Sequence, residues 1–341
     1  MKALVFHGPH QMAWEDWPDP HPGPGQALIA VRAVGICGSD VHGYTGLSGR
    51  RVPPMIMGHE AVGEVVALGK GTPDGFLGQQ VIIRPTVVCG QCEMCRSGRA
   101  NLCKNRSMIG VQQPGAMAEF VAAPVENLLA LPEEMDCEAG TLVEPLAVGV
   151  RAVHQAGNVS GKRVLIAGCG SIGLLTMVAA RQGGARQVAM TDVVAKRRET
   201  ARVLGADLAI DPRQPDWQEQ LQRAVGGAGV DVAFDAVGIP ATFEQAIFSL
   251  SWCGTLVALG GWQTVTLDLP RLVGREIHLA GTFNYTPGEF ELAQQWLAKR
   301  VFNPAVFITD LYPISDGAQV FARLAQSQSD SIKVVLTADQ R

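Results

Sequence analysis

A glycine-rich turn in the middle of the chain constrains its fold more than any other stretch. Residues 168–173 read Gly-Cys-Gly-Ser-Ile-Gly and follow the continuous apolar run Val164–Ala167. Such a run predicts a strand covered on both faces, as in a parallel sheet, and the residues after the turn predict a helix to about Arg181. A G-x-G-x-x-G turn between strand and helix places a phosphate at the helix N-terminus. We therefore expect the turn to bind a dinucleotide through Gly168, Gly170, Ser171, Ile172 and Gly173.

An acidic residue, Asp192, follows the next predicted strand, Val188–Thr191. Dinucleotide-binding folds place a carboxylate about 20 residues after the turn, where it accepts hydrogen bonds from the adenosine ribose. Its charge would repel a 2′-phosphate, so we expect NAD rather than NADP. Taken alone, Asp192 is also compatible with an ordinary acid at a strand end. Arg197 is a candidate for stacking on adenine, with a solvated helix face as the alternative.

Strands and helices continue to alternate until residue 282 and amount to about six parallel strands, a complete doubly wound sheet. Two strand-end turns, 236–238 and 259–261, should lie at the carboxyl edge of that sheet, where such folds bind their cofactor. We expect Val237, Leu259 and Gly260 to hold the nicotinamide there. The other predicted elements of this region are helices 195–204, 217–224 and 241–250 and strands 208–210, 231–236, 255–259 and 277–282.

The first part of the chain has a different sequence pattern, in which short runs of strand-forming residues are separated by turn residues. This pattern predicts a barrel-like β domain. The tail, with a predicted helix 287–299 and strand 333–337, should return to that domain. At 341 residues the chain is long enough for two domains. We place a catalytic β-rich domain at 1–150, a dinucleotide-binding domain at 151–285 and the returning segment at 286–341, an α/β fold.

Composition excludes several classes of protein. The net charge is -4 and the pI is near 6.0, which argues against a nucleic-acid surface. The N-terminus resembles a strand rather than a secretory leader. The charge-free run 164–180 fits a strand, a turn and a helix better than a membrane span. We expect a cytoplasmic protein without nucleic-acid or membrane partners.

Four of the eight cysteines cluster within fifteen residues and predict a structural metal site. Their spacing is C-x2-C-x2-C-x7-C, and four thiolates close a tetrahedral zinc site with no open position. An iron–sulfur cluster is the main rival, but the ferredoxin pattern needs a shorter last spacer followed by proline. The predicted ligands are Cys89, Cys92, Cys95 and Cys103.

A second set of metal-binding residue types lies between Cys37 and Glu60. A thiolate, an imidazole and a carboxylate are the ligands of a catalytic zinc that keeps an open position. Glycines flank Cys37 and His59, so the backbone can approach closely. Asp40 is available to hold the far nitrogen of the imidazole. Ser39 and His42, beside Cys37, could carry a proton from the substrate to water.

Together these motifs resemble the zinc-dependent medium-chain dehydrogenases over essentially the whole chain. The resemblance implies a GroES-like catalytic domain interrupted by a Rossmann domain, with a catalytic zinc in the cleft between them. It also implies two zinc ions per chain, a proton relay through Ser39 and His42, and a homotetramer or dimer.

The third zinc ligand separates the branches of that family. Where simple alcohol dehydrogenases have a cysteine, this chain has Leu142-Val143-Glu144-Pro145-Leu146, which resembles the polyol (sorbitol-type) and butanediol branches. The resemblance places both Glu60 and Glu144 near the metal and leaves open which of them binds it. Threonine dehydrogenases usually have Asp-Pro-Phe at this place, so the sequence favours the polyol branch over a threonine dehydrogenase.

We therefore expect an NAD-dependent enzyme that reversibly oxidises a secondary hydroxyl of a polyol or diol to a ketone. A carboxylate-rich site offers acceptors to a second hydroxyl, so primary alcohols should be poor substrates. The alternatives are a threonine, butanediol or sugar-phosphate dehydrogenase, the last because Arg50-Arg51 could bind phosphate. A hypothesis from another functional class is a non-catalytic nucleotide-binding or zinc-ribbon scaffold protein. Candidate substrate-lining residues are Tyr44, Arg50, Phe283 and Tyr285.

Overall fold

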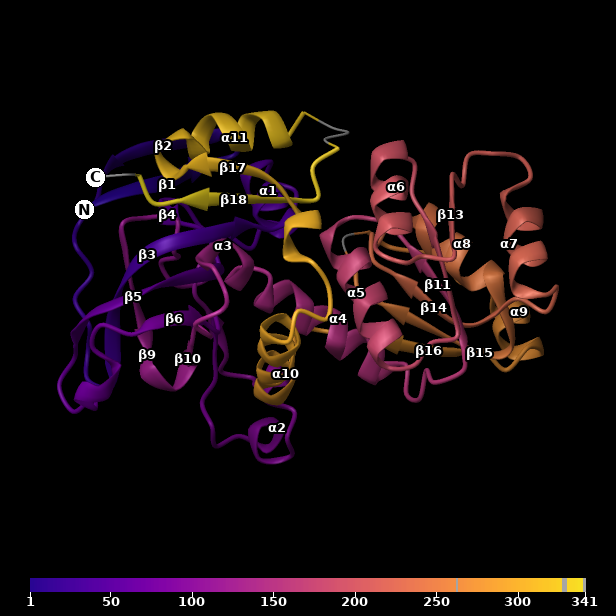
Figure 1. Ribbon diagram of the computed structural model, residues 1–341, viewed down its shortest axis with the longest axis horizontal. Coiled ribbons are helices and arrows are strands. Elements are labelled where there is room, and N and C mark those ends of the chain that lie inside the picture. The colour runs from indigo at the N-terminus through magenta and orange to yellow at the C-terminus, as the bar shows by residue number, and fades with distance from the viewer. Residues whose placement is uncertain (262, 327–329, 340–341) are drawn as a thin grey trace. The chain divides into compact units, whose positions relative to one another are not determined.

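The computed structural model describes residues 1–261, 263–326 and 330–339, and its chain divides into two compact units (Figure 1). Unit 1 comprises Met1–Glu144 and Thr286–Arg341, and unit 2 comprises Pro145–Tyr285. The first division falls inside helix α4, Val143–Gln155, and therefore earlier than the boundary at 150 placed from the sequence. Proline near the start of α4 is tolerated because the first N–H groups of a helix have no intrahelical acceptor.

Unit 1 is built on a seven-stranded sheet in the order β10-β6-β5-β3-β18-β17, with β9 also paired to β3. A smaller sheet has the order β2-β1-β4, and β7 pairs with β8. Figure 1 shows the C-terminal strands, in yellow, lying beside strands from the N-terminal half. The strands are β1 Lys2–Gly8, β2 Gln11–Asp16, β3 Gln26–Ile36, β4 Met55–Ile56, β5 Glu60–Leu68, β6 Gln80–Ile83, β7 Thr86–Val87, β8 Ser107–Met108, β9 Phe120–Pro124, β10 Leu128–Ala130, β17 Ile308–Pro313 and β18 Lys333–Thr337. The helices are α1 Gly38–Tyr44, α2 Glu93–Arg96, α3 Cys137–Gly140, α10 Pro287–Ala298 and α11 Gly317–Leu324.

The register of three strands in unit 1 positions the candidate catalytic residues. Strands β3 and β5 are antiparallel and pair Gly35 with Glu60. Strand β18 is antiparallel to β3 and pairs Val334 with Ile36, so Lys333 lies at the end of β3. Helix α1 begins directly after β3. The end of β3, the start of β5 and the start of β18 therefore meet, although they are far apart in the sequence.

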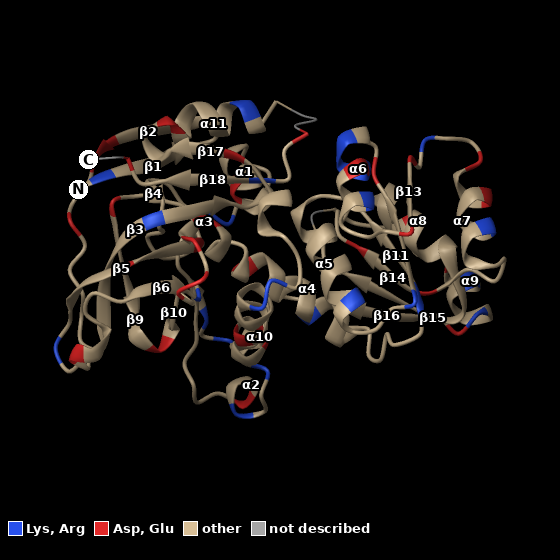
Figure 2. Ribbon diagram, in the orientation of Figure 1, with Lys and Arg blue, Asp and Glu red and all other residues tan. Residues whose placement is uncertain are grey.

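Unit 2 contains a six-stranded sheet in the order β13-β12-β11-β14-β15-β16, in which neighbouring strands are parallel. Its central strands are apolar and buried, and helices such as α8 pack on them. Figure 2 shows charged residues concentrated along helices such as α6, while β11 and β14 carry few. The strands are β11 Arg163–Ala167, β12 Gln187–Thr191, β13 Leu208–Ile210, β14 Val230–Asp235, β15 Leu250–Ala258 and β16 His278–Gly281. The helices are α5 Ser171–Gln182, α6 Ala195–Val203, α7 Trp217–Val225, α8 Pro240–Ser249 and α9 Leu269–Gly274.

The structure confirms the α/β class, the β-rich first part and the parallel sheet with about six strands. It also confirms that the tail returns to the first part of the chain, because β18 pairs with β3. Among the described residues, no helix combines the length and the apolar character needed to cross a membrane.

Candidate functional site

Cys37, His59 and Glu60 come together where two chain segments meet, the start of α1 and the start of β5. Cys37 is the N-cap of α1, His59 precedes β5, and Glu60 is the first residue of that strand. One ligand atom from each lies within 4.8 Å of the other two. Gly58 has φ +97° and a Cβ there would lie 2.7 Å from Met117 Cγ, so this turn requires glycine. The backbone thus delivers the thiol, imidazole and carboxylate predicted from the sequence to one point.

Asp40 links the two ligands that come from different segments. Its Oδ2 accepts a hydrogen bond of 3.1 Å from the Cys37 N–H, which closes the capping box of α1. Its Oδ1 lies 3.4 Å from Nδ1 of His59. Asp40 is completely buried. It therefore fixes the Cys37 turn and the imidazole together, which is the orienting role expected from the sequence.

The electrostatics of this cluster fit a bound cation. Burial raises the pKa of Asp40, but the charges of His59 and Arg51 outweigh it and hold the pKa below its usual range. Burial lowers the pKa of His59, but Asp40 and Cys37 more than offset this and raise the pKa well above the usual value. Surroundings that favour a proton on the imidazole also favour a metal cation beside it. The donor set of one sulfur, one nitrogen and one oxygen suits zinc.

Glu60 has a cationic partner that the sequence did not reveal. Lys333 Nζ lies 2.8 Å from Oε1 and 2.6 Å from Oε2 of Glu60, and 3.2 Å from the carbonyl oxygen of Ile36. Both side chains are buried, with exposures of 1% and 0%. Burial lowers the pKa of Lys333, but the charges of Glu60, Cys37 and Glu144 outweigh burial. The pKa of Lys333 is therefore higher than that of an ordinary lysine. The ammonium therefore stays charged and neutralises part of the anionic cluster.

Glu144 is the second candidate carboxylate, and it lies in the first turn of α4. It is 5% exposed and acts electrostatically on Lys333, which places it near the cluster. It is not among the three residues whose ligand atoms lie within 4.8 Å of one another. In this geometry Glu60 is the carboxylate that belongs to the ligand group.

Ser39 and His42, the residues of the proposed proton relay, are the second and fifth residues of the short helix α1. Ser39 donates its N–H to Cys37 Sγ at 3.4 Å. Burial lowers the pKa of His42, and Arg51 lowers it further. His42 is therefore neutral near pH 7 and able to accept a proton.

The four residues expected from the sequence to line the substrate site differ in their burial. Tyr44 is 4% exposed and packs in the hydrophobic core, with ring centroids 5.2 Å from His10 and 5.5 Å from Phe321. Its ring belongs to the core under α1, and its contact with substrate stays a prediction. Arg50 is exposed, Phe283 is partly buried and Tyr285 is buried. Their contact with substrate stays a prediction.

The four clustered cysteines converge as predicted, on the segment that contains α2. Their sulfurs lie within 4.8 Å of one another. Two sulfur pairs, Cys92 with Cys95 and Cys89 with Cys103, are each separated by 3.5 Å. Zinc–sulfur bonds of about 2.3 Å in a tetrahedron separate the sulfurs by about 3.8 Å, close to this spacing. The backbone N–H of Cys95 lowers the pKa of Cys92 to about 6, which favours a thiolate there, whereas burial and the neighbouring sulfurs raise the pKa of Cys95 to about 12. A metal must therefore displace the proton of Cys95.

The glycine-rich turn in unit 2 has the geometry of a phosphate-binding turn. A Cβ on Gly168, whose φ is +100°, would lie 2.6 Å from Val237 Cγ2, and a Cβ on Gly173 would lie 1.9 Å from the Gly168 carbonyl oxygen. Gly170 is the N-cap of α5 and has no atom within 4 Å of its Cβ position. The first and third glycines thus serve close packing, and the second leaves open space at the helix N-terminus.

Asp192 lies at the carboxyl end of β12, directly opposite that turn. Its Oδ2 accepts from the Cys169 N–H and its Oδ1 from the Val194 N–H, each at 2.8 Å. It therefore holds the turn in place and retains lone pairs for ribose hydroxyls. At the same edge, Gly260 packs so closely on Val237 and Gly238 that a Cβ would meet their backbone at 2.5 Å. The predicted Val237, Leu259 and Gly260 turns are thus adjacent to each other. Arg197 lies on α6 and is partly buried.

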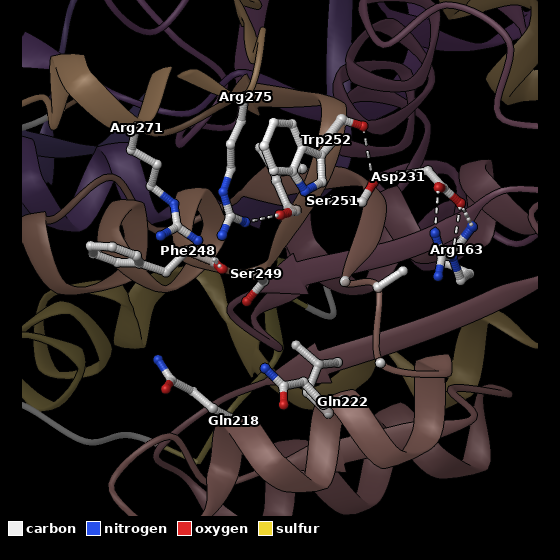
Figure 3. A pocket seen from close by; sticks show the side chains of 15 residues that line it. Arg163, Gln218, Gln222, Asp231, Phe248, Ser249, Ser251, Trp252, Arg271 and Arg275 are labelled. Atoms are coloured by element: carbon white, nitrogen blue, oxygen red, sulfur yellow. Dashed lines mark hydrogen bonds and ion pairs between the residues drawn. The ribbon is translucent and has the colours of Figure 1, made fainter. Parts of the chain in front are cut away.

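A pocket of about 700 Å³ in unit 2 lies at the opposite edge of the sheet (Figure 3). Its walls include Arg163, the first residue of β11, and Asp231 near the start of β14. Parallel strands share their amino ends at one edge, so this pocket is separate from the turns at the carboxyl edge. Arg163 and Asp231 pair at 2.8 Å.

The other charged groups of this pocket hold its walls together. Arg271 donates to the Phe248 carbonyl oxygen at 2.8 Å, and its guanidinium lies 4.3 Å from the Phe248 ring centroid. Arg275 donates to the Leu250 carbonyl oxygen at 3.3 Å. Figure 3 shows Arg271 directed towards Phe248 and Arg275 lying beside Trp252. Arg271 therefore connects α9 to the end of α8, and Arg275, the C-cap of α9, connects it to the start of β15.

Comparison with known proteins agrees with this geometry. Residues 23–133 match the family described as the alcohol dehydrogenase GroES-like domain, and residues 171–299 match the zinc-binding dehydrogenase family. An L-galactonate-5-dehydrogenase of Escherichia coli (strain K12) is 33% identical over 338 residues, 99% of this chain and 99% of the relative. The chain belongs to the zinc-binding dehydrogenase family. It is thus an oxidoreductase, and the resemblance inferred from its motifs is confirmed.

Two further members of the family show how far the similarity extends. A sorbitol dehydrogenase of Bacillus subtilis (strain 168) is 32% identical, covering 98% of this chain and 97% of its own length. A solved structure described as a short chain alcohol dehydrogenase of Escherichia coli CFT073, in complex with NADH, has a TM-score of 0.91. It is 26% identical, and the match covers 99% of both chains. The relatives named after sugar acids and sugar alcohols match the polyol branch expected from Glu144.

Sequence reasoning missed two buried cations of this dehydrogenase. Lys333 is the first residue of the apolar strand β18. A single lysine in an otherwise apolar strand was the one sequence signal of a buried charge. The sequence favours a solvated loop charge for Arg51, with a phosphate ligand as the alternative. Its guanidinium is instead 2% exposed and bound to Asp40 at 2.5 Å.

Proposed function

We propose that this dehydrogenase oxidises a secondary hydroxyl of a polyol or sugar alcohol to a ketone with NAD. The observation that carries the proposal is the group of half-buried Cys37 with buried His59 and Glu60, with an orienting Asp40 and the Ser39 and His42 side chains beside it. A non-catalytic scaffold has no need for such a ligand group next to a neutral histidine. The relatives named L-galactonate-5-dehydrogenase and sorbitol dehydrogenase support a polyhydroxylated substrate.

Cys37, His59 and Glu60 would hold the catalytic zinc, and the dinucleotide would lie on the Gly168–Gly173 turn with its ribose against Asp192. When bound, zinc acidifies the substrate hydroxyl and NAD accepts the carbinol hydride. The chain's own part is to move the proton. Ser39 accepts it from the substrate oxygen and passes it to His42, which is neutral near pH 7 because burial and Arg51 lower its pKa.

Two carboxylates on one site favour a substrate with a second hydroxyl. Glu144 is buried near Glu60 and Lys333, so it offers an acceptor that a vicinal hydroxyl can satisfy. A primary alcohol such as ethanol has no second hydroxyl to donate to that carboxylate. The expected penalty in kcat/KM is on the order of 10⁴, as for other sites that lose a buried hydrogen bond to substrate.

One assay tests the proposal: NADH formation with a sugar alcohol, a sugar-alcohol phosphate, 2,3-butanediol, threonine and ethanol under identical conditions. We expect the sugar alcohol to have the highest kcat/KM and Cys37→Ser to abolish turnover without unfolding the protein. Ethanol as the best substrate would overturn the polyol assignment. The phosphate or threonine as the best substrate would move the enzyme to another branch. Absence of turnover with all five would contradict the proposal.

The assembly and location are further proposals. We propose a homotetramer, with a dimer as the alternative, on the resemblance to the family, and sedimentation of a stable monomer would refute it. We propose a cytoplasmic location because the site chemistry needs reduced thiols at Cys37 and in the four-cysteine cluster. Labelling of these thiols in intact cells tests the location.

A further inference from the structure

Arg51 is buried in the loop between α1 and β4, in contact with the residues next to the ligand group. Its side chain is 2% exposed, and one guanidinium nitrogen, Nη2, lies 2.5 Å from Asp40 Oδ1 and 3.3 Å from Ser39 Oγ. Its neighbour Arg50 is exposed, so the two adjacent arginines have different roles. A buried guanidinium is costly to desolvate and is retained where its charge is matched.

The fold makes room for this side chain at one position of α1. A Cβ on Gly43 would lie 2.3 Å from Cδ and 2.9 Å from Nε of Arg51. Any larger residue at position 43 would displace the guanidinium. Helix α1 therefore contains the two residues that Arg51 binds, Ser39 and Asp40. The missing side chain at Gly43 leaves the space that the Arg51 side chain occupies.

We propose that Arg51 is a positioning residue for both the metal-ligand group and the proton relay. Through Asp40 it fixes the carboxylate that holds Cys37 and His59 in place. Through Ser39 it sets the direction of a hydroxyl, because an oxygen that accepts from Arg51 must donate its own hydrogen elsewhere. This inference rests on the proposed function, since it assigns Arg51 to the zinc site and relay proposed above.

The consequence for Asp40 is electrostatic as well as geometric. Its carboxylate is 0% exposed and lies 3.4 Å from Nδ1 of His59, longer than an ideal hydrogen bond. Without Arg51, the charge of Asp40 would rest on His59 alone, and the imidazole would be pulled towards Asp40. Loss of an outer partner of this kind typically weakens metal binding or activity by 10–100-fold.

The experiment compares Arg51→Met, Arg51→Lys and Arg32→Met in the full-length, zinc-loaded enzyme. Arg32 is the matched control, because its 2.7 Å pair with Glu64 is on the surface, with exposures of 50% and 34%. Zinc release to a chromogenic chelator counts the two zinc sites separately, and the four-cysteine site reports that the variant is folded. The visible spectrum after Co²⁺ replaces the catalytic zinc reports ligand geometry, which a purely structural role for Arg51 would not change.

We expect Arg51→Met to weaken catalytic-site zinc binding by 10–100-fold, leave the four-cysteine zinc in place, and shift the Co²⁺ spectrum. Its kcat/KM at saturating zinc should also fall, because Ser39 is no longer directed. Arg51→Lys should keep the fold and zinc but still lower kcat/KM and shift the spectrum, because the lysine side chain is one bond shorter and its ammonium cannot take the place of the nitrogen between Asp40 and Ser39. Arg32→Met should match the unmodified enzyme. Zinc affinity, spectrum and kcat/KM of Arg51→Lys and Arg51→Met equal to those of Arg32→Met would overturn the inference. An unmodified enzyme without catalytic zinc or turnover would instead refute the proposed function.

Discussion

Replacing Lys333 with methionine tests how much of the stability of unit 1 depends on one buried charge. The ammonium has three N–H donors, and the structure supplies three acceptors at 2.6, 2.8 and 3.2 Å. Methionine has a similar length and fills the same space, so the main loss is the charge rather than the packing. Glu60 would then be a fully buried carboxylate without its cation. Breaking a buried ion pair from one side costs about 3–5 kcal/mol, a third or more of the stability of many domains.

The measurement is urea unfolding of Lys333→Met with and without a zinc chelator. The loss should be larger in the chelated protein, because a zinc ion gives Glu60 a second cationic neighbour. The matched control is Lys70→Met, an exposed lysine of the same unit, expected to change the free energy of unfolding by less than about 0.5 kcal/mol. The pH dependence has a definite sign. The pKa of Lys333 is raised in the folded state, so its contribution is fully present below the unfolded value of about 10.4 and is lost as the pH rises through the folded value. Equal destabilisation by the two substitutions at neutral pH would refute this account of the pair.

Other substitutions separate the metal and cofactor sites. Cys92→Ser should remove one zinc per chain and lower the midpoint of thermal unfolding, whereas Cys37→Ser should remove activity with that midpoint largely kept; elemental analysis finding fewer than two zincs in the metal-replete, unmodified protein would count against both. Asp192→Ala should reduce the preference for NAD over NADP at least 10-fold in kcat/KM, since ribose hydrogen bonds and a repulsive charge disappear together; equal use of both cofactors by the unmodified enzyme would contradict this. Gly173→Ala should abolish NADH binding measured by fluorescence, because its Cβ would lie 1.9 Å from the Gly168 carbonyl oxygen; unchanged binding would show that the turn is not the dinucleotide site.

Local sequence signals were sufficient wherever the chemistry depends on residues close together in the chain. The four cysteines fall within fifteen residues, so their convergence needed only a short loop. The glycine turn needed only the strand before it and the helix after it, and both form at the expected residues. The pairing of Asp40 with Cys37 is likewise local, because a capping box spans a single helical turn.

The sequence by itself determined the ligand types, the alternation of strands and helices, and the family. The tertiary structure decided which charges meet. Lys333 reaches Glu60 only because β18 pairs with β3, across 273 positions of sequence. Arg51 folds back on α1 because Gly43 leaves a gap there, and the ring of Tyr44 packs into the core. A buried charge is stable only beside its partner, and the partner depends on strand register and on space between elements, neither of which a linear pattern contains.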